Sequence, residues 1–249
     1  MVYLKSSSRE YDGSLIALQD AARVAADIKR WLIVGGHMVN LHVVRAGVQA
    51  PLRLTRDADL AVEVPEIRDR GLVAKLRRLG YDNPVFSNRF DRDADGLFAS
   101  IDLLVPSYYT KTRPNIDADV IAVDGMPVID VAFEREPVLV DVVADLVDGR
   151  RVEFTVRIPD LVSAIAMKSY AVAERTNVLD PKDLAHLLEA AKLDGTGHDS
   201  WPTSKVFAGA ARQLVAQFDK PGSALSQASD SEEVQARLRD LTRSLVGHI

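Results

Sequence analysis

The sequence predicts an α/β fold: a mixed sheet covered by helices in the N-terminal half, followed by a mainly helical C-terminal region. Three observations lead to this prediction. Short apolar runs alternate with segments of helical periodicity as far as residue 105. A glycine pair joins a strand-like run directly to a helix-like one at 31–46. After Ile158, the remaining segments have helical periodicity.

The elements expected in the N-terminal half alternate in type. They are helix 12–30, strand 31–34, helix 37–46, strand 52–64, helix 66–79, and strands 85–91 and 96–105. Apolar residues recur at helical spacing in 12–30, whereas 31–34 is a short apolar run that ends at glycine. Pro65 ends the second strand, and Gly80 ends the helix that follows it.

Fewer strands are expected in the rest of the chain. The polar, proline-containing stretch 106–119 is a candidate domain boundary or active-site loop. Strand-like runs follow at 128–131, 138–146 and 151–158, and helices at 159–176, 181–193, 200–218 and 231–246. We therefore place the catalytic core at 1–110, and a C-terminal part with a few strands and a helical bundle at 111–249.

Size and composition limit the class of protein. The chain has 249 residues, of which 47% are hydrophobic and 27% charged, as in ordinary globular proteins. It has no cysteine, which excludes disulfides, thiolate metal sites and cysteine nucleophiles. No apolar run could span a bilayer and no signal peptide is evident, so a cytoplasmic location without membrane contact is expected. A net charge of −5 argues against nonspecific coating of nucleic acid.

Two aspartates interrupt the second predicted strand. Asp57 and Asp59 are one residue apart, and alternate strand residues point to the same face, so both carboxylates project together. Like charges placed side by side among apolar residues need a compensating cation, and a divalent metal suits hard carboxylate oxygens. The alternative is an exposed face of an edge strand.

Asp102 adds a third carboxylate, again within an apolar run. If its strand lies beside that of Asp57 and Asp59, the three groups converge. Such a set can hold two divalent ions about 4 Å apart for in-line displacement at phosphorus. Mg²⁺ is the expected metal, since it takes oxygen ligands, and Mn²⁺ could replace it.

The pair Gly35-Gly36 lies where a strand feeds a helix. Glycine lets the backbone approach a phosphate closely, and a helix N-terminus supplies N–H donors. Glycines at such places are also often simple turn formers.

Lys168 and Asp183 are candidates with competing explanations. Helical spacing places Lys168 on one face with Ala164, Ala171 and Arg175, a small-residue surface with two cations that could bind phosphate. A solvated lysine would explain the same pattern. Asp183 lies in the first turn of a helix that Asp180 could cap, which explains an acidic residue there without catalysis.

These segments together resemble a known superfamily. Gly35-Gly36, Thr55-Arg-Asp57-Ala-Asp59-Leu60 and the later Asp102 are similar to the nucleotidyltransferase fold typified by DNA polymerase β. The segments 158–168 and 180–188, with Lys168 and Asp183, resemble the AbiEii/MenT group of toxin nucleotidyltransferases. The resemblance covers about residues 30–190.

The resemblance implies roles for particular residues. Catalysis falls to Asp57, Asp59, Asp102 and Asp183, the first three holding two Mg²⁺ ions. Nucleotide binding falls to Gly35, Gly36, Thr55, Arg56 and Lys168. The implied substrates are an NTP and the tRNA 3′ end, and the implied partner is a cognate antitoxin protein. Two alternatives stay open: transfer to a small molecule, as in aminoglycoside nucleotidyltransferases, and a non-catalytic binding protein with the same fold.

Overall fold

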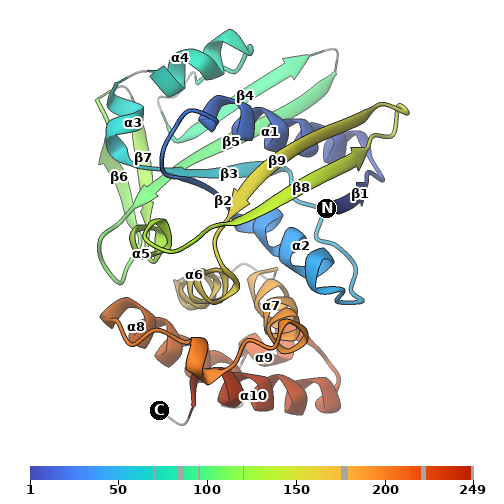
Figure 1. Cartoon of the computed structure of the whole chain (residues 1–249), viewed down its shortest axis with the longest axis vertical. Coiled ribbons are helices and arrows are strands. Elements are labelled where there is room, and N and C mark those ends of the chain that lie inside the picture. Colours follow the sequence, from blue (N-terminus) through green and yellow to red (C-terminus); the bar gives the residue numbers. More distant parts are fainter. Residues whose placement is uncertain are drawn as a thin grey trace.

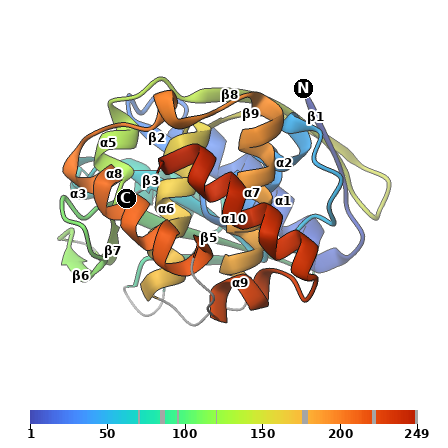
Figure 2. The same cartoon turned by 90° about the horizontal axis from the view of Figure 1, so that it is seen from below.

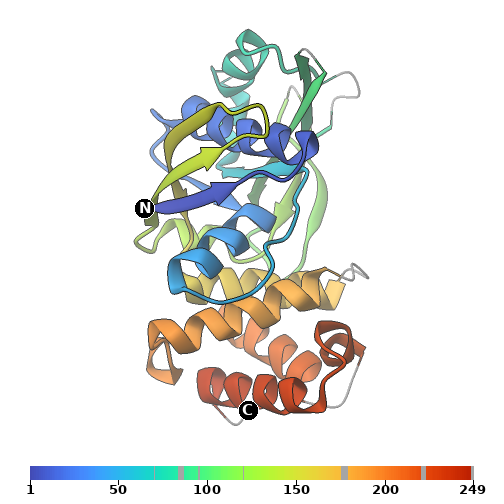
Figure 3. The same cartoon turned by 90° about the vertical axis from the view of Figure 1, so that its right-hand side faces the viewer.

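The computed structural model describes residues 1–69, 71–83, 87–94, 96–119, 121–174, 179–219 and 223–247. Two sheets and the helices between and around them form the N-terminal part, and helices alone form a layer at the other end (Figures 1 and 3). The predicted α/β class, with a mixed sheet followed by a mainly helical region, is confirmed.

The larger sheet has six strands in the order β2-β3-β5-β7-β6, with β4 also paired to β5. The strands are β2 (Trp31–Val34), β3 (Asp57–Val62), β4 (Arg89–Ala94), β5 (Leu97–Pro106), β6 (Arg113–Asp117) and β7 (Ala122–Met126). Strand β5 is parallel to β3 and β7, and the other pairs are antiparallel. Since β6 and β7 complete this sheet, it extends across the predicted division at 110/111.

The smaller sheet has three strands, β1 (Val2–Lys5), β8 (Val138–Asp145) and β9 (Arg151–Ile158). Strands β8 and β9 confirm the runs predicted at 138–146 and 151–158. Strand β1 was not predicted; it is four residues long and parallel to β8, more than 130 positions away in the chain.

Helix α1 (Arg9–Ala25) lies between the two sheets and packs against β3, β5 and β9 (Figure 1). It begins three residues before the predicted 12–30 segment, because the Ser8 side chain accepts a hydrogen bond from the Tyr11 N–H and caps the helix. At Gly13 the helix approaches β5 so closely that an added Cβ would lie 1.8 Å from the Phe98 carbonyl oxygen. This contact fixes the helix against the strand that carries Asp102.

The C-terminal helices form the layer seen from below in Figure 2. They are α6 (Leu161–Glu174), α7 (Asp180–Asp194), α8 (Lys205–Leu214), α9 (Ser223–Ala228) and α10 (Glu232–Val246), with a 3₁₀ turn at His198–Ser200 and a π-helical turn at Val215–Asp219. Helix α2 (Gly35–Ala46) packs against both α7 and β3, so it connects this layer to the sheet. None of the helices built from the described residues is long and apolar enough to cross a membrane.

Several predicted elements differ from those observed. Strand 52–64 is regular only from Asp57 to Val62, and helix 66–79 is two helices, α3 (Val64–Arg68) and α4 (Gly71–Arg78). The stretch 106–119 is not only a loop, because it contains β6. The strand predicted at 85–91 falls partly outside the described residues, and β4 runs on to Ala94.

The strand predicted at 128–131 is wrong: the segment forms helix α5 (Ile129–Phe133). Val128 has a φ of +75°, which turns the chain out of the extended conformation directly after β7. Val128 and Ile129, two of the β-branched residues that suggested a strand, are buried instead at the start of this short helix. Strand β7 and helix α9 were not predicted.

Candidate active site

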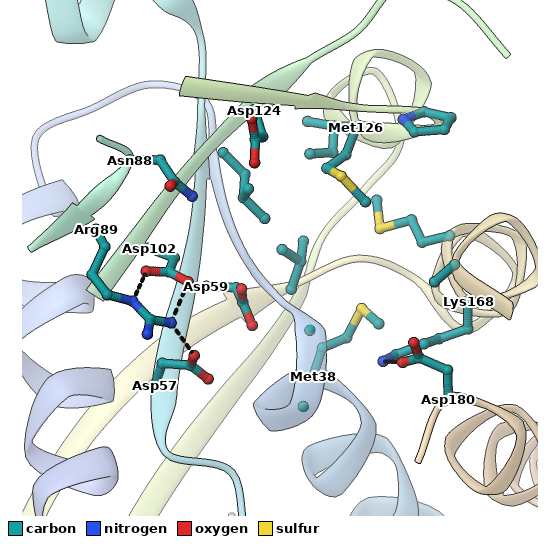
Figure 4. Close-up of a pocket in the computed structure, with 18 of the residues that line it drawn as sticks. Met38, Asp57, Asp59, Asn88, Arg89, Asp102, Asp124, Met126, Lys168 and Asp180 are labelled. Carbon is teal, nitrogen blue, oxygen red and sulfur yellow. Dashed lines mark hydrogen bonds and ion pairs between the residues drawn. The ribbon is translucent and has the colours of Figure 1, made fainter. Parts of the chain in front are cut away.

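A cavity of about 350 Å³ opens between the larger sheet and the helices α2, α6 and α7. Strands β3, β5 and β7 supply carboxylates to one wall, and helices α6 and α7 supply Lys168 and Asp180 to the opposite wall (Figure 4). The residues predicted to bind metal and several of those predicted to bind nucleotide line this one cavity.

The structure brings the three predicted carboxylates together. Asp59 on β3 and Asp102 on β5 are direct partners in the register of two parallel strands. Asp57 lies two residues before Asp59, so its side chain projects from the same face. All three line the cavity, where Figure 4 shows them side by side. The alternative of an exposed edge strand is wrong, because β3 lies between β2 and β5.

Gly35 makes room for one of these carboxylates. Strands β2 and β3 pair Val34 with Asp59, which places the next residue beside the aspartate. Gly35 has a φ of +64°, and a Cβ added there would lie 1.8 Å from Asp59 Oδ2. Glycine is therefore required both by the backbone conformation and by the position of the Asp59 side chain.

The first turn of α2 also faces the cavity. Helix α2 begins at Gly35 itself, and its N-cap Val34 offers no side-chain acceptor. Gly36 lines the cavity as well, and a Cβ there would lie 2.8 Å from Thr55 Oγ1. The N–H groups and the positive end of the helix dipole are thus available to an anion in the cavity.

A cation already contacts the carboxylates. Arg89, on β4, donates from Nε to Asp102 Oδ1 at 2.8 Å, and from Nη2 to Asp102 Oδ2 at 2.8 Å and Asp57 Oδ2 at 2.7 Å. The hydrogen bond to Asp102 holds the pKa of Arg89 above its ordinary value. Within the described ranges no group of three or more aspartate, glutamate or histidine side chains is arranged as a ready-made metal site. The carboxylates are arranged around the guanidinium instead.

The opposite wall contains a buried ion-pair network. Lys168 is 5% exposed and donates to Asp180 Oδ1 at 2.9 Å and Asp183 Oδ2 at 2.8 Å. Arg53 also donates to Asp183 and lies 3.9 Å from Asp180. The alternative of a solvated Lys168 is therefore wrong, and the lysine reaches the cavity from within a network of two cations and two carboxylates.

Asp183 and Asp180 have different positions from those of helix caps. The N-cap of α7 is Leu179, and Asp180 is the first helical residue, so the predicted capping by Asp180 is wrong. Both carboxylates are buried and bind Lys168. Asp180 lines the cavity, whereas Asp183 lies behind it and contacts Lys168 and Arg53.

Polar atoms on this wall have unused hydrogen-bonding capacity. In the part of the chain that the structure describes, Asp180 Oδ2 and Arg53 Nε are buried without a hydrogen-bond partner. Such atoms are costly in an apolar interior. Both residues also line the cavity.

Two further candidates, Thr55 and Arg56, do not line the cavity, and neither does the buried His37. Thr55 is buried, and its hydroxyl lies 3.3 Å from Asp57 Oδ1, so it positions a carboxylate. Arg56 is exposed and lies outside the cavity. Hydrogen bonds from the Glu10 backbone and with Ser8 lower the pKa of the Glu10 carboxyl most, and the charge of Arg56 lowers it further. His37 is buried against Ser14, with Oγ and Nε2 2.7 Å apart. Arg175, which was expected on the face of Lys168, lies outside the described residues.

The structure adds cavity residues that the sequence did not identify as candidates. Asp124 on β7 is a fourth carboxylate, paired in register with Leu104, two residues after Asp102. Arg53 and Asn88 join it from irregular segments. An aspartate in the apolar run 121–126 was a usable signal for Asp124, whereas no local pattern marks Arg53.

The cavity therefore has two chemically different sides. One side presents carboxylate oxygens with one guanidinium and the start of α2 beside Asp59, and the other presents an ammonium group, a second guanidinium and the Asp180 carboxylate. A site of this kind suits a ligand that carries both anionic groups and bound cations.

Comparisons with known proteins give only a distant likeness. No family model matches the chain, and no curated protein matches it. Among seven matching chains of solved structures is the antibiotic-resistance factor ANT(2'')-Ia, whose solution structure aligns with 92% of this chain and 91% of its own, at 14% identity and a TM-score of 0.34. A likeness this distant does not bear on the reaction, and the resemblance to the toxin group gains no support from it.

Proposed function

We propose that the protein is a divalent-metal-dependent nucleotidyltransferase, which moves a nucleoside monophosphate from an NTP to an acceptor hydroxyl. The observation that supports this most directly is the convergence of Asp57, Asp59 and Asp102 on adjacent parallel strands, beside the uncapped start of α2. Carboxylates next to the N–H donors of a helix start match the two parts of a metal–nucleotide complex.

The carboxylates would hold the metal. Asp57 and Asp102 both contact one Arg89 nitrogen, so the two side chains lie close enough for a single cation to bridge them. With Asp59 they form an all-oxygen donor set that suits Mg²⁺ or Mn²⁺. When bound, the metal would neutralise the phosphates and polarise the α-phosphate.

The chain's own residues would position the nucleotide and remove a proton. The N–H groups of Gly35 and Gly36 and the Lys168 ammonium can bind the phosphate oxygens. Asp183 would hold Lys168 in place. The acceptor hydroxyl passes its proton to a carboxylate, Asp102 or Asp59, while its oxygen bonds to the α-phosphorus and pyrophosphate leaves.

An isosteric substitution tests this mechanism. Asp59→Asn should reduce incorporation of labelled nucleotide by at least about a thousandfold, because an amide replaces a carboxylate ligand. Asp141→Asn is the matched control, since Asp141 is exposed on β8, away from the cavity, and accepts a hydrogen bond from the Thr155 hydroxyl. Full incorporation by the Asp59→Asn enzyme would contradict the mechanism.

For the acceptor we infer the 3′ end of tRNA, and one surface favours it over a small molecule. Directly after β5, Tyr108 and Tyr109 are 63% and 61% exposed, and Lys111 and Arg113 are exposed beside them. The Arg113 guanidinium lies 5.1 Å from the centre of the Tyr109 ring. Exposed aromatic rings with interleaved cations suit stacking on unpaired bases.

This surface adjoins the cavity. Ser107 donates its backbone N–H to Met126, which lines the cavity, and the Thr112 backbone N–H lies 3.3 Å from both carboxylate oxygens of Glu174 at the end of α6. A strand end held here could direct its terminal hydroxyl towards the carboxylates.

Parallel assays separate the two acceptor classes. The protein is incubated with Mg²⁺, each labelled NTP, and either total tRNA or a set of aminoglycosides. We expect label in tRNA, and a Tyr109→Ala variant should raise the KM for tRNA about tenfold, in line with the loss of one stacked base. Label in the aminoglycosides alone would establish the small-molecule alternative.

A toxin role, with a cognate antitoxin protein as partner, rests on the motif resemblance. Expression of the wild-type chain should then stop growth, and Asp59→Asn should relieve the arrest. Normal growth with an enzyme that is active in vitro would rule out the toxin role while leaving nucleotidyl transfer intact.

A further inference from the structure

Arg89 holds a position that the proposed chemistry requires for a metal. Its Nη2 atom contacts Asp57 Oδ2 at 2.7 Å and Asp102 Oδ2 at 2.8 Å. Its Nε atom contacts the other oxygen of Asp102 at 2.8 Å. One guanidinium thus engages three carboxylate oxygens from two strands.

The sheet determines this contact. In the antiparallel pairing of β4 with β5, Arg89 lies directly opposite Asp102. In the parallel pairing of β3 with β5, Asp102 lies opposite Asp59. Arg89 and the carboxylates therefore project from the same face, and the planar fork of the guanidinium holds both oxygens of Asp102 while it also reaches Asp57.

The electrostatics explain why a cation is needed here. Asp57 and Asp102 have side chains that are 28% and 16% exposed, and Asp59 is the register partner of Asp102 and lines the same cavity. Three close carboxylates repel one another, which raises the free energy of the folded protein unless a cation compensates them. Lys168 and Arg53 lie on the other wall, bound to Asp180 and Asp183.

We propose that Arg89 is a positioning residue that competes with divalent metal for Asp57 and Asp102. This inference rests on the proposed function, because that function brings the metal to these carboxylates. In the metal-free protein the guanidinium holds the carboxylates together, and metal binding must first break its hydrogen bonds. A bound NTP would then offer the released guanidinium a new anionic partner in the same cavity.

The competition makes a prediction opposite to that of a purely structural role. Replacing Arg89 by glutamine removes the competing charge, so Mn²⁺ should bind about tenfold more tightly or better in the absence of nucleotide. Loss of mere structural support would disorder the carboxylates and weaken Mn²⁺ binding. The direction of the change therefore distinguishes the two roles.

The experiment is a calorimetric titration of the full chain with Mn²⁺ at pH 8. Arg89→Gln is compared with wild type, and Arg89→Lys, which keeps the charge without the planar fork, should lie between them. Arg151→Gln is the matched control: Arg151 makes an exposed bidentate pair with Asp145 on the smaller sheet, and its loss should leave the affinity unchanged.

An unchanged or weaker Mn²⁺ affinity in Arg89→Gln would overturn the proposal, provided circular dichroism shows a folded variant. If Arg89→Gln does not fold, Arg89→Lys replaces it: tighter Mn²⁺ binding than in wild type supports the proposal, and unchanged or weaker binding overturns it. The labelled-nucleotide assay on the wild-type enzyme is separate. If the wild-type enzyme transfers nucleotide but Arg89→Gln binds Mn²⁺ no more tightly, the competition alone is refuted. If Arg89→Gln binds Mn²⁺ more tightly but the wild-type enzyme transfers no nucleotide, the proposed function alone is refuted.

Discussion

At the scale of single residues, the site depends on side chains whose neighbours leave little freedom. Gly35 is the clearest case, since Asp59 occupies the space in which a Cβ would lie. Lys168 is another, because two carboxylates surround an ammonium group that is almost fully buried. Substitutions at these positions should therefore have effects that are large and of predictable kind.

Gly35→Ala should displace the Asp59 carboxylate and reduce nucleotide incorporation by at least about a hundredfold, since misplacement of about 1 Å has effects of that size. The positive φ adds a backbone cost of about 1–2 kcal/mol to the free energy of folding. Gly149→Ala isolates that cost, because Gly149 also has a positive φ but has open space where the Cβ would go. Incorporation assays measure the activity of the two variants, and urea unfolding measures their free energies of unfolding. Equal activity of the two variants would show that Gly35 does not position Asp59.

Lys168→Met should lower the free energy of unfolding by roughly 3–5 kcal/mol, because it leaves Asp180 and Asp183 buried with one cation fewer. Lys182→Met is the control, since Lys182 is exposed on the same helix as both aspartates. Urea unfolding at pH 7 measures the difference. If both variants are equally stable, Lys168 is not part of the buried network.

At the scale of elements, helix α2 joins the sheet to the helical layer and carries two buried histidines. Burial lowers the pKa of His37 and of His42 to about 4. His42 Nε2 donates to the Pro159 carbonyl oxygen at 2.9 Å, directly before α6. Burial, rather than these hydrogen bonds, therefore favours the neutral form of both imidazoles.

These histidines should make the protein acid-sensitive. The unfolded chain takes up protons near pH 6.5, whereas the folded histidines do so only near pH 4, so stability is full above pH 6.5 and falls as the pH drops to 4. Each contributes roughly 3 kcal/mol to that loss. Urea unfolding at pH 6.5 and at pH 4 measures the loss of stability. His42→Asn should make that loss smaller by roughly 3 kcal/mol, whereas His198→Asn, at an exposed position, should leave it unchanged. An identical pH dependence in His42→Asn and wild type would contradict this.

At the scale of the whole molecule, the cavity walls come from elements that are far apart in the chain. The carboxylates lie on β3 and β5, and Lys168 and Asp180 lie on α6 and α7 in the helical layer. A ligand that contacts both walls therefore connects the sheet to this layer (Figure 4). Its binding should stabilise the folded chain as a whole.

Mg²⁺ together with the correct NTP should raise the melting temperature by several degrees. A ligand at one hundred times its Kd adds about 2.7 kcal/mol to the stability of the native state. Each NTP is tested by thermal shift with and without Mg²⁺, and Asp59→Asn should show no rise. If none of the four NTPs stabilises the wild-type protein, the non-catalytic alternative replaces the proposed function.

The sequence by itself determined the class of fold and the carboxylate cluster. Both follow from local patterns. Apolar periodicity identifies helices and strands, and aspartates in apolar strands identify positions where a charge needs a compensating partner. Strands 138–146 and 151–158 were predicted closely for this reason. Segment 128–131 failed because its β-branched residues suit both a strand and a buried helical turn, and only the left-handed backbone at Val128 decides between them.

Only the tertiary structure decided how the site residues are partnered. The pairing of Asp59 with Asp102, the contact of Arg89 with both Asp57 and Asp102, and the joining of Arg53 to Asp183 across 130 positions depend on strand register and helix packing. These are long-range contacts, and no local pattern encodes which partner a charged side chain meets. For that reason the sequence identified the carboxylates, whereas the structure showed which cations hold them.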